Sequence, residues 1–173
     1  YQKLNSIIDK SVKIGENFSL GYNSLIKKNV IIGNNVSIGS NCIISNCIIG
    51  SNVIINDGSV IGKIGFGFKK IKGKIIFIPH IGRVILDDHV YIGSNCTIDR
   101  GSFSDTLIGS GTMIDNLTHI AHNVQIGSDC FIAAQAGIAG STKIGEACLV
   151  GGQVGISGHL SIGNNVHIGG KSG

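Results

Sequence analysis

An aliphatic residue recurs at every sixth position through the C-terminal part of the chain. The eleven positions are Ile108, Ile114, Ile120, Ile126, Ile132, Ile138, Ile144, Val150, Ile156, Ile162 and Ile168. A period of six fits neither the 3.6-residue period of a helix nor the two-residue period of an ordinary strand. It predicts a solenoid in which each hexad forms one short strand and a corner, and three hexads close a triangular coil of 18 residues.

The same pattern covers most of the N-terminal half. It runs in steps of six from Ile14 to Ile44, slips by five residues to Ile49, and then continues to Ile61. The aliphatic side chains are expected to fill the interior of a prism whose coils stack as parallel strands about 4.8 Å apart. We therefore predict an all-β parallel β-helix that occupies residues 1–173 as a single domain.

The repeat is interrupted twice. Residues 63–83 break the pattern, and they hold three of the six phenylalanines and the only proline. Four extra residues also occur near Gly101–Asp105. Long surface insertions cost little free energy, so the first segment is expected to project from one corner as a loop. Such a loop is a candidate binding feature, and packing on its own prism or on a neighbouring subunit is the equal alternative.

Basic residues are concentrated in this loop. The net charge is +4, and residues 63–83 contain six basic residues and no acid. An acidic protein partner, met by Lys69 and Lys70, is one interpretation. A solvated basic loop is the other. Aromatic residues spaced for stacking on bases are missing, which argues against nucleic acid.

Five cysteines, Cys42, Cys47, Cys96, Cys130 and Cys148, all fall on inward positions of the repeat. Buried small hydrophobic residues are the favoured interpretation, and an odd count without a paired CxxC indicates a reducing cytosol. No run of eighteen apolar residues and no signal peptide is visible, so no membrane span is expected.

The phase of the repeat brings two candidate residues together. His122 lies at a corner, and Gly140 follows 18 residues later, at the same phase one coil on. A neutral imidazole beside an approachable glycine N–H is a general base beside an oxyanion donor, which is the minimum for acyl transfer. His159 lies at the neighbouring phase, within about 10 Å along the axis. A solvated corner histidine is the simpler alternative.

Two other functions fit parts of the sequence. A zinc site would use His119 and His122 with His89 or His80, as in a trimeric hexapeptide carbonic anhydrase family, but the spacing of the close pair differs and no metal is expected. A purely structural or ice-binding solenoid favours regular rows of threonine, whereas the threonines here are scattered.

Several motifs resemble those of the UDP-3-O-(3-hydroxyacyl)glucosamine N-acyltransferases of lipid A biosynthesis. The resemblance covers nearly all of residues 12–173 and is strongest over 97–159. It rests on the motifs Thr97-Ile-Asp-Arg-Gly101, Asp105-Thr106, Ile114-Asp-Asn116, Ile120-Ala-His-Asn-Val124, Ala139-Gly-Ser141, Gly151-Gly152 and Gly158-His159, and on Gly65-Phe-Gly67 and Ile78-Pro79 through Gly82-Arg-Val84 in the loop.

This resemblance implies a left-handed β-helix that forms a homotrimer, with active sites between subunits. It implies transfer of a 3-hydroxyacyl chain from acyl carrier protein, through its phosphopantetheine arm and without a further cofactor, to the 2-amine of a UDP-3-O-acylglucosamine in the cytoplasm of a Gram-negative bacterium. His122 matches the base, Gly140 the oxyanion donor and His159 a second functional histidine. Further residues are expected to bind substrate, namely Asp115, Asn116, Phe66, Phe68 and His80.

Related activities stay open at this point. The sister O-acyltransferases, which act on UDP-N-acetylglucosamine, typically carry Asp after the base and His after the oxyanion glycine, where this chain has Asn123 and Ser141. An acetyl-CoA-dependent sugar N- or O-acetyltransferase is the other enzymatic alternative. The N-acyltransferases also have an N-terminal uridine-binding domain and usually a C-terminal helical segment. Because neither is present here, we expect the native polypeptide to be longer.

Overall fold

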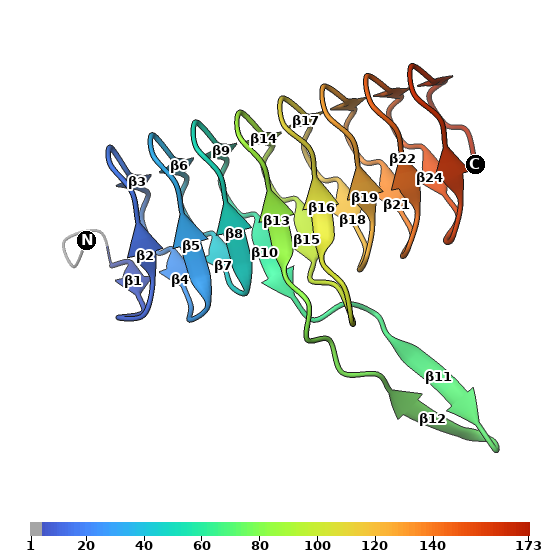
Figure 1. Cartoon of the computed structure of the whole chain (residues 1–173), viewed down its shortest axis with the longest axis horizontal. Coiled ribbons are helices and arrows are strands. Elements are labelled where there is room, and N and C mark those ends of the chain that lie inside the picture. The colour runs from blue at the N-terminus through green and yellow to red at the C-terminus, as the bar shows by residue number, and fades with distance from the viewer. Residues whose placement is uncertain (1–4) are drawn as a thin grey trace.

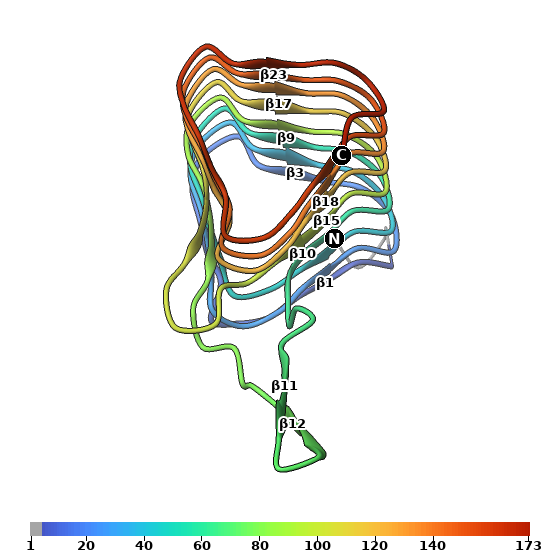
Figure 2. The ribbon, with the colours of Figure 1, turned by 90° about the vertical axis from the view of Figure 1, so that its right-hand side faces the viewer.

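A computed structural model describes residues 5–173. Three parallel sheets form the sides of a triangular prism, and the chain visits them in turn (Figures 1 and 2). No described residue is helical, so this part of the chain offers no helix that could cross a membrane. The all-β solenoid predicted from the period of six is confirmed.

Each sheet has eight strands. Sheet 1 contains β1 (Ile7–Ile8), β4 (Leu25–Ile26), β7 (Ile43–Ile44), β10 (Val60–Lys63), β15 (Thr97–Asp99), β18 (His119–Ile120), β21 (Gly137–Ile138) and β24 (Gly155–Ile156). Sheet 2 contains β2 (Lys13–Ile14), β5 (Val30–Ile32), β8 (Cys47–Ile49), β13 (Val84–Leu86), β16 (Thr106–Ile108), β19 (Gln125–Ile126), β22 (Lys143–Ile144) and β25 (Ser161–Ile162). Sheet 3 contains β3 (Ser19–Leu20), β6 (Ser37–Ile38), β9 (Ile54–Ile55), β14 (Tyr91–Ile92), β17 (Met113–Ile114), β20 (Phe131–Ile132), β23 (Leu149–Val150) and β26 (His167–Ile168).

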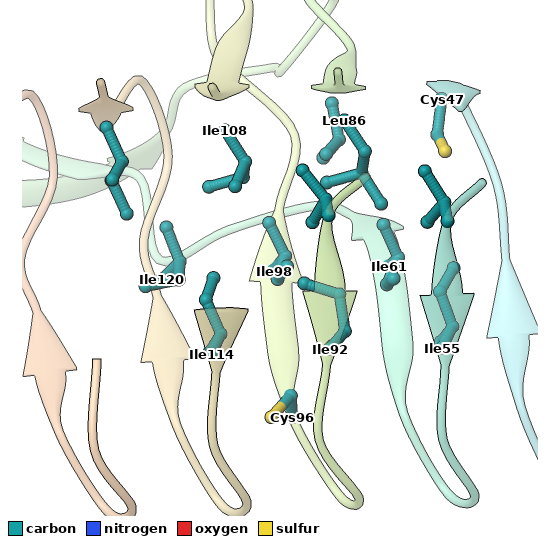
Figure 3. Close-up of a cluster of buried hydrophobic side chains, with 14 of the residues drawn as sticks. Cys47, Ile55, Ile61, Leu86, Ile92, Cys96, Ile98, Ile108, Ile114 and Ile120 are labelled. Atoms are coloured by element: carbon teal, nitrogen blue, oxygen red, sulfur yellow. The ribbon is translucent and has the colours of Figure 1, made fainter. Parts of the chain in front are cut away.

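The repeat aliphatics form the core. Ile61, Ile98 and Ile120 come from successive strands of sheet 1 and are fully buried (Figure 3). The partners across sheet 1 are in register, for example Ile98 with Ile120, so identical phases stack along the axis. All five cysteines are buried and unpaired, as predicted, and burial raises the pKa of the Cys47 thiol.

The corners depend on residues with a left-handed backbone. Most corners contain one residue with φ between 46° and 63°, and eleven of these residues are asparagines. Asparagine tolerates this conformation better than most residues do. Some of these asparagines also form ladders, because Asn17 Nδ2 donates to Asn35 Oδ1 at 2.9 Å and Asn35 Nδ2 to Asn52 Oδ1 at 3.1 Å.

The insertion at residues 63–83 projects from the corner between sheets 1 and 2, as predicted (Figures 1 and 2). Its outer part is a hairpin of β11 (Phe68–Ile71) and β12 (Lys74–Phe77), in which Ile71 pairs with Lys74. The two turn residues, Lys72 and Gly73, have φ of 48° and 78°. Two consecutive positive φ values match the right-handed twist of a tight hairpin. We call residues 63–83 the arm.

Candidate active site

The corner between sheets 1 and 2 carries the predicted pair of residues. His122 follows β18, and Gly140 follows β21 one coil later. A Cβ atom added to Gly140 would lie 2.7 Å from Cε1 and 2.9 Å from Nε2 of His122. The imidazole of His122 therefore lies directly over Gly140, in space that only glycine leaves open.

The N–H group of Gly140 is available to a ligand. Its neighbours are engaged in the stack, because Ala139 N donates to Ile156 O at 2.9 Å and Ser141 N to His122 O at 3.0 Å. Within residues 5–173, no acceptor binds the Gly140 N–H. An unpaired N–H beside a histidine ring suits a developing oxyanion.

Asn123 sets the tautomer of His122. The Nδ1 atom of His122 lies 3.0 Å from Asn123 Oδ1. The same oxygen accepts from Ser102 N at 3.0 Å and from Ser102 Oγ at 2.7 Å, so it is an acceptor. His122 Nδ1 must then carry the proton, which leaves Nε2 with a free lone pair. A neutral imidazole with Nε2 unprotonated is the form that a general base requires.

Residues of the second insertion, near Gly101–Asp105, hold the Asn123 side chain in place. Its amide nitrogen Nδ2 donates to Ser104 O at 2.9 Å and to Ser104 Oγ at 2.8 Å, and its backbone N to Thr106 Oγ1 at 2.9 Å. The extra residues predicted near 101–105 therefore hold the side chain that orients His122. Asn123 itself was missed from the sequence as a site residue, although its place beside both His122 and an irregular loop was a usable signal.

A hollow of about 580 Å³ opens in front of His122 and Gly140. Its floor is the outer face of sheet 1, where Gly137 and Gly155 present no side chains. Phe66 of the arm and His119 of β18 form other parts of its wall. The hollow thus combines the imidazole of His122, the unpaired N–H group of Gly140 and a groove without side chains.

The aromatic residues of the arm lead to His122. Ring centroids are 4.9 Å apart for Phe66 and Phe68, 5.4 Å for Phe68 and Phe77, 6.1 Å for Phe77 and His80, and 5.1 Å for His80 and His122. Phe66 and Phe68 are exposed beside the hollow, where a substrate can reach them.

His80 is buried, with 5% of its surface exposed, and it contacts His122 edge to face. Its Nδ1 lies 2.9 Å from Ile78 O, whereas its buried Nε2 has no partner within the described residues. Burial lowers the pKa of His80, which favours the neutral ring. In this arrangement His80 supports the ring of His122 instead of facing the hollow.

His119 lines the same hollow, where its two ring nitrogens face Thr97 and Asp99. Its Nδ1 lies 2.7 Å from Thr97 Oγ1, and its Nε2 lies 3.7 Å from Asp99 Oδ2. Asp99 is buried and also forms an ion pair of 2.5 Å with Lys63 of the arm. Of the two rings, only that of His122 has an Nε2 that faces no carboxylate among the described residues.

The remaining predicted residues lie apart from His122. His159 is on the same corner two coils on, where its N–H donates to Gly140 O at 3.1 Å and its side chain is exposed. Asp115 and Asn116 lie on the corner between sheets 3 and 1, so the single chain does not bring them to His122. Lys69 and Lys70 are exposed on β11.

Asp115 instead borders a second hollow. This hollow, of about 600 Å³, covers the outer face of sheet 3 and is lined by apolar side chains that include Tyr91, Phe131 and Leu149. Residues 5–173 contain no group of three or more His, Cys, Asp or Glu side chains placed to hold a metal ion.

Comparisons with known proteins agree with the fold and point to one enzyme class. The family model "Bacterial transferase hexapeptide (six repeats)" matches residues 11–46, 29–63 and 105–140. UDP-3-O-acylglucosamine N-acyltransferase 2 of Nitrobacter winogradskyi is 54% identical over 83 residues, which are 48% of this chain and 24% of that protein. The UDP-3-O-acylglucosamine N-acyltransferase of Methylobacterium nodulans is 57% identical over 83 residues, again 48% and 24%. The matched part is thus about a quarter of the length of these relatives.

A solved structure covers more of the chain. LpxA from Acinetobacter baumannii superposes with a TM-score of 0.85 over 96% of this chain and 64% of its own, at 27% identity. The matches of the family model together span more than half of the chain and coincide with the coils on both sides of the arm. The chain belongs to the bacterial transferase hexapeptide family.

Proposed function

We propose that the protein carrying this chain transfers a 3-hydroxyacyl group from acyl carrier protein to the 2-amine of UDP-3-O-acylglucosamine, a step of lipid A biosynthesis. The observation that carries the proposal is the stacking of the His122 ring on Gly140, which has an unpaired N–H. The names of the relatives that are 54% and 57% identical support the choice of acceptor.

In this mechanism the acceptor amine attacks the carbonyl carbon of the thioester. Nε2 of His122 takes the amine proton as the new N–C bond forms, and the Gly140 N–H donates to the oxyanion. The tetrahedral intermediate then collapses, the C–S bond breaks, and the imidazolium returns the proton to the leaving thiolate. The protons balance, and neither a metal nor a covalent acyl-enzyme is needed.

The arm and a neighbouring subunit complete the site in this proposal. The exposed Lys69 and Lys70 attract the acidic carrier protein, and Phe66 and Phe68 line the path of its acyl chain. In a homotrimer, the apolar face of sheet 3 is covered, and Asp115 and Asn116 of one subunit reach the His122 hollow of the next. His159 contacts the sugar nucleotide. The reaction takes place in the cytoplasm, where the acyl carrier protein that bears the acyl group is found.

The test is a transfer assay on the purified protein with product detected by mass spectrometry. Product is expected from 3-hydroxyacyl carrier protein and UDP-3-O-acylglucosamine, and not from acetyl-CoA with the same acceptor. Turnover with acetyl-CoA alone would replace the proposal with a sugar acetyltransferase. Absence of turnover with either donor, in a protein that is folded and assembled, would leave a structural solenoid.

O-acylation of UDP-N-acetylglucosamine is the second candidate. It is favoured by the superposition on LpxA, at 27% identity and a TM-score of 0.85. The same assay, run with UDP-N-acetylglucosamine as acceptor, separates the two because the product is then an ester instead of an amide. Faster turnover of UDP-N-acetylglucosamine would reverse the order of the candidates.

A further inference from the structure

Two neighbouring residues of one sequence motif attach the ends of the arm to the prism. Asp99 and Arg100 belong to the run Thr97-Ile-Asp-Arg-Gly101, and β15 ends at Asp99. Neither residue lines the hollow in front of His122, so the acyl-transfer mechanism does not use them. Both nevertheless contact the arm at the points where it leaves and rejoins the prism.

Asp99 holds the end at which the arm begins. Lys63 is its neighbour across sheet 1, and Lys63 Nζ lies 2.5 Å from Asp99 Oδ1. The Asp99 side chain is 1% exposed, and among residues 5–173 no other lysine or arginine forms an ion pair with it. A buried carboxylate is costly without a charged partner, so this ion pair ties Lys63 to the prism. Gly65 passes over the same carboxylate, because an added Cβ would lie 2.8 Å from Asp99 Oδ2.

Arg100 holds the end at which the arm returns. Its Nε donates to Gly82 O at 2.6 Å, and its Nη2 donates to Ile81 O at 2.9 Å. Its backbone N also donates to Lys63 O at 2.9 Å, so this one residue contacts both ends of the arm. The planar guanidinium donates to two neighbouring carbonyl groups at once, whereas the ammonium group of a lysine is a single point of charge on a flexible stem.

The outer part of the arm depends on these two ends for its position. All eight residues of β11 and β12 are exposed, and the hairpin projects away from the prism (Figure 1). A two-stranded hairpin without a packed face is only marginally stable in water. The direction of the arm is therefore set where it meets the prism, and a change at either end moves the residues in between.

Each attachment lies next to an arm residue of the candidate active site. His80 comes directly before Ile81, and Phe66 comes directly after Gly65. The ring of His80 contacts the ring of His122 edge to face, with centroids 5.1 Å apart, and Phe66 forms part of the wall of the hollow. Displacement of a catalytic group by about 1 Å can lower the rate about 100-fold, so small movements of the arm affect the reaction.

We propose that Asp99 and Arg100 are positioning residues for the acyl transfer. Asp99 fixes the start of the arm, and Arg100 fixes its return. Together they keep His80 packed on His122 and Phe66 at the hollow. This inference rests on the proposed function, because the rate that the two residues affect is that of acyl transfer at His122.

The pKa of His80 reports whether the arm stays in place. Burial is the largest cause that lowers this pKa, and the hydrogen bond to Ile78 raises it. The charges around the ring act in both directions, since His122 and Arg100 lower the pKa and Asp99 raises it. Release of the arm would expose His80 and so raise its pKa. Loss of the Asp99 charge alone would lower it instead, and Arg100→Lys keeps the positive charge.

The test uses this chain with Asp99→Asn and Arg100→Lys, and it takes Lys143→Ala, which changes an exposed lysine of sheet 2, as the control. A histidine NMR titration gives the pKa of His80, hydrogen exchange measures the protection of the arm, and the transfer assay gives kcat and KM. We expect both variants to raise the pKa of His80 and to speed amide exchange over residues 64–82. We expect kcat to fall about ten-fold, with KM for the UDP-sugar little changed and the circular dichroism spectrum intact. Lys143→Ala should match the wild type in every measurement.

A lower pKa of His80 in Asp99→Asn, or an unchanged pKa in Arg100→Lys, would overturn the proposal, because the two residues would then act by charge alone. A normal kcat in both variants would overturn it as well. If circular dichroism shows that Asp99→Asn does not fold, Arg100→Lys decides the outcome, since it leaves the buried ion pair of Asp99 intact.

The outcome is separable from the proposed function, because the NMR titration and hydrogen exchange need no substrate. Release of the arm in both variants, in a protein whose wild type transfers no acyl group, would keep the attachment of the arm and contradict the function. Acyl transfer by the wild type, with an arm that stays protected in both variants, would keep the function and contradict the positioning role.

Discussion

The coils before and after the arm build their corners differently. In residues 5–62, all eight non-glycine residues with positive φ are asparagines. From residue 106 onward there are ten such residues, and only Asn123 and Asn165 are asparagines. The others include Leu117, Ser141 and His159, for which a left-handed conformation costs more than it does for asparagine.

The difference extends over all three corners and includes the edge that carries the candidate site. At the corner between sheets 1 and 2, the left-handed position is Asn29 and Asn46 before the arm, and Asn123, Ser141 and His159 after it. Strained residues persist where the surrounding structure holds them, and they concentrate at functional sites. We therefore expect the corners of the N-terminal coils to contribute more to stability than those of the C-terminal coils, which carry the candidate site. The left-handed φ of Ala147 has no explanation in its contacts.

Among the substitutions that leave His122 itself in place, the largest effect should come from Gly140→Ala. Its Cβ would lie 2.7 Å from Cε1 of His122, so the ring must shift from its present position over Gly140. Because misplacing a reacting group by about 1 Å can cost about 100-fold, kcat/KM should fall by about that factor while the fold stays intact. Gly163→Ala, where the added Cβ meets nothing within 4 Å, is the control. Equal kcat/KM for both variants would remove Gly140 from the site.

Asn123→Ala should have the next largest effect. Loss of Oδ1 frees Nδ1 of His122 and removes the contacts to Ser102 and Ser104, so the tautomer with a free Nε2 is no longer enforced. We expect kcat to fall at least about ten-fold, with KM little changed, because positioning of the base is lost. The tautomer of His122, measured by ¹⁵N NMR, should shift from the form protonated at Nδ1 towards a mixture of the Nδ1-protonated and Nε2-protonated forms. An unchanged tautomer and an unchanged kcat would show that Asn123 only supports the loop.

His159→Asn tests the exchange of stability for function directly. Asparagine is easier to accommodate at φ 61°, so the unfolding free energy should rise by about 1 kcal/mol. The lost imidazole should lower kcat/KM by about ten-fold, the equivalent of one good hydrogen bond. Thermal unfolding measures the expected rise in stability, and steady-state kinetics on the same preparation measure the expected fall in kcat/KM. A His159→Asn variant that is less stable than the wild type, or fully active, would contradict the proposed exchange of stability for function.

Asn35→Ala should give the opposite pattern with a smaller effect on activity. It removes a left-handed asparagine and the ladder bonds to Asn17 and Asn52, at 2.9 and 3.1 Å. Stability should fall by about 1–2 kcal/mol, since exposed hydrogen bonds contribute little and the backbone preference contributes the rest. Activity measured well below the unfolding temperature should be unchanged. A loss of activity without a loss of stability would mean that the N-terminal coils take part in catalysis.

Much of the fold could be predicted because a period of six constrains every coil. Ile44 to Ile49 marks the shortened coil, and the 17-residue spacing of the bond from Asn35 to Asn52 is its structural counterpart. The arm was predictable only as an interruption. The six-residue repeat does not predict its hairpin, although Lys72-Gly73 between two apolar runs was a usable turn signal.

The site was predictable where it depends on phase and not elsewhere. An 18-residue interval placed His122 on Gly140. The same reasoning, applied to Asp115 and Asn116, would have placed them one corner earlier than His122. His80 lies outside the repeat, so its burial against His122 could not be derived from spacing. The roles of Lys69 and Lys70 stay predictions.

The most direct measurement of the central claim is kcat/KM for His122→Ala beside His119→Ala. Both histidines line the same hollow, but Nε2 of His119 faces the carboxylate of Asp99 at 3.7 Å, whereas Nε2 of His122 faces no carboxylate among the described residues. We predict a loss of about 10²–10⁴-fold for His122→Ala, as expected for removal of a general base, and less than about ten-fold for His119→Ala. A larger loss for His119→Ala, or near-normal turnover in His122→Ala, would contradict the account.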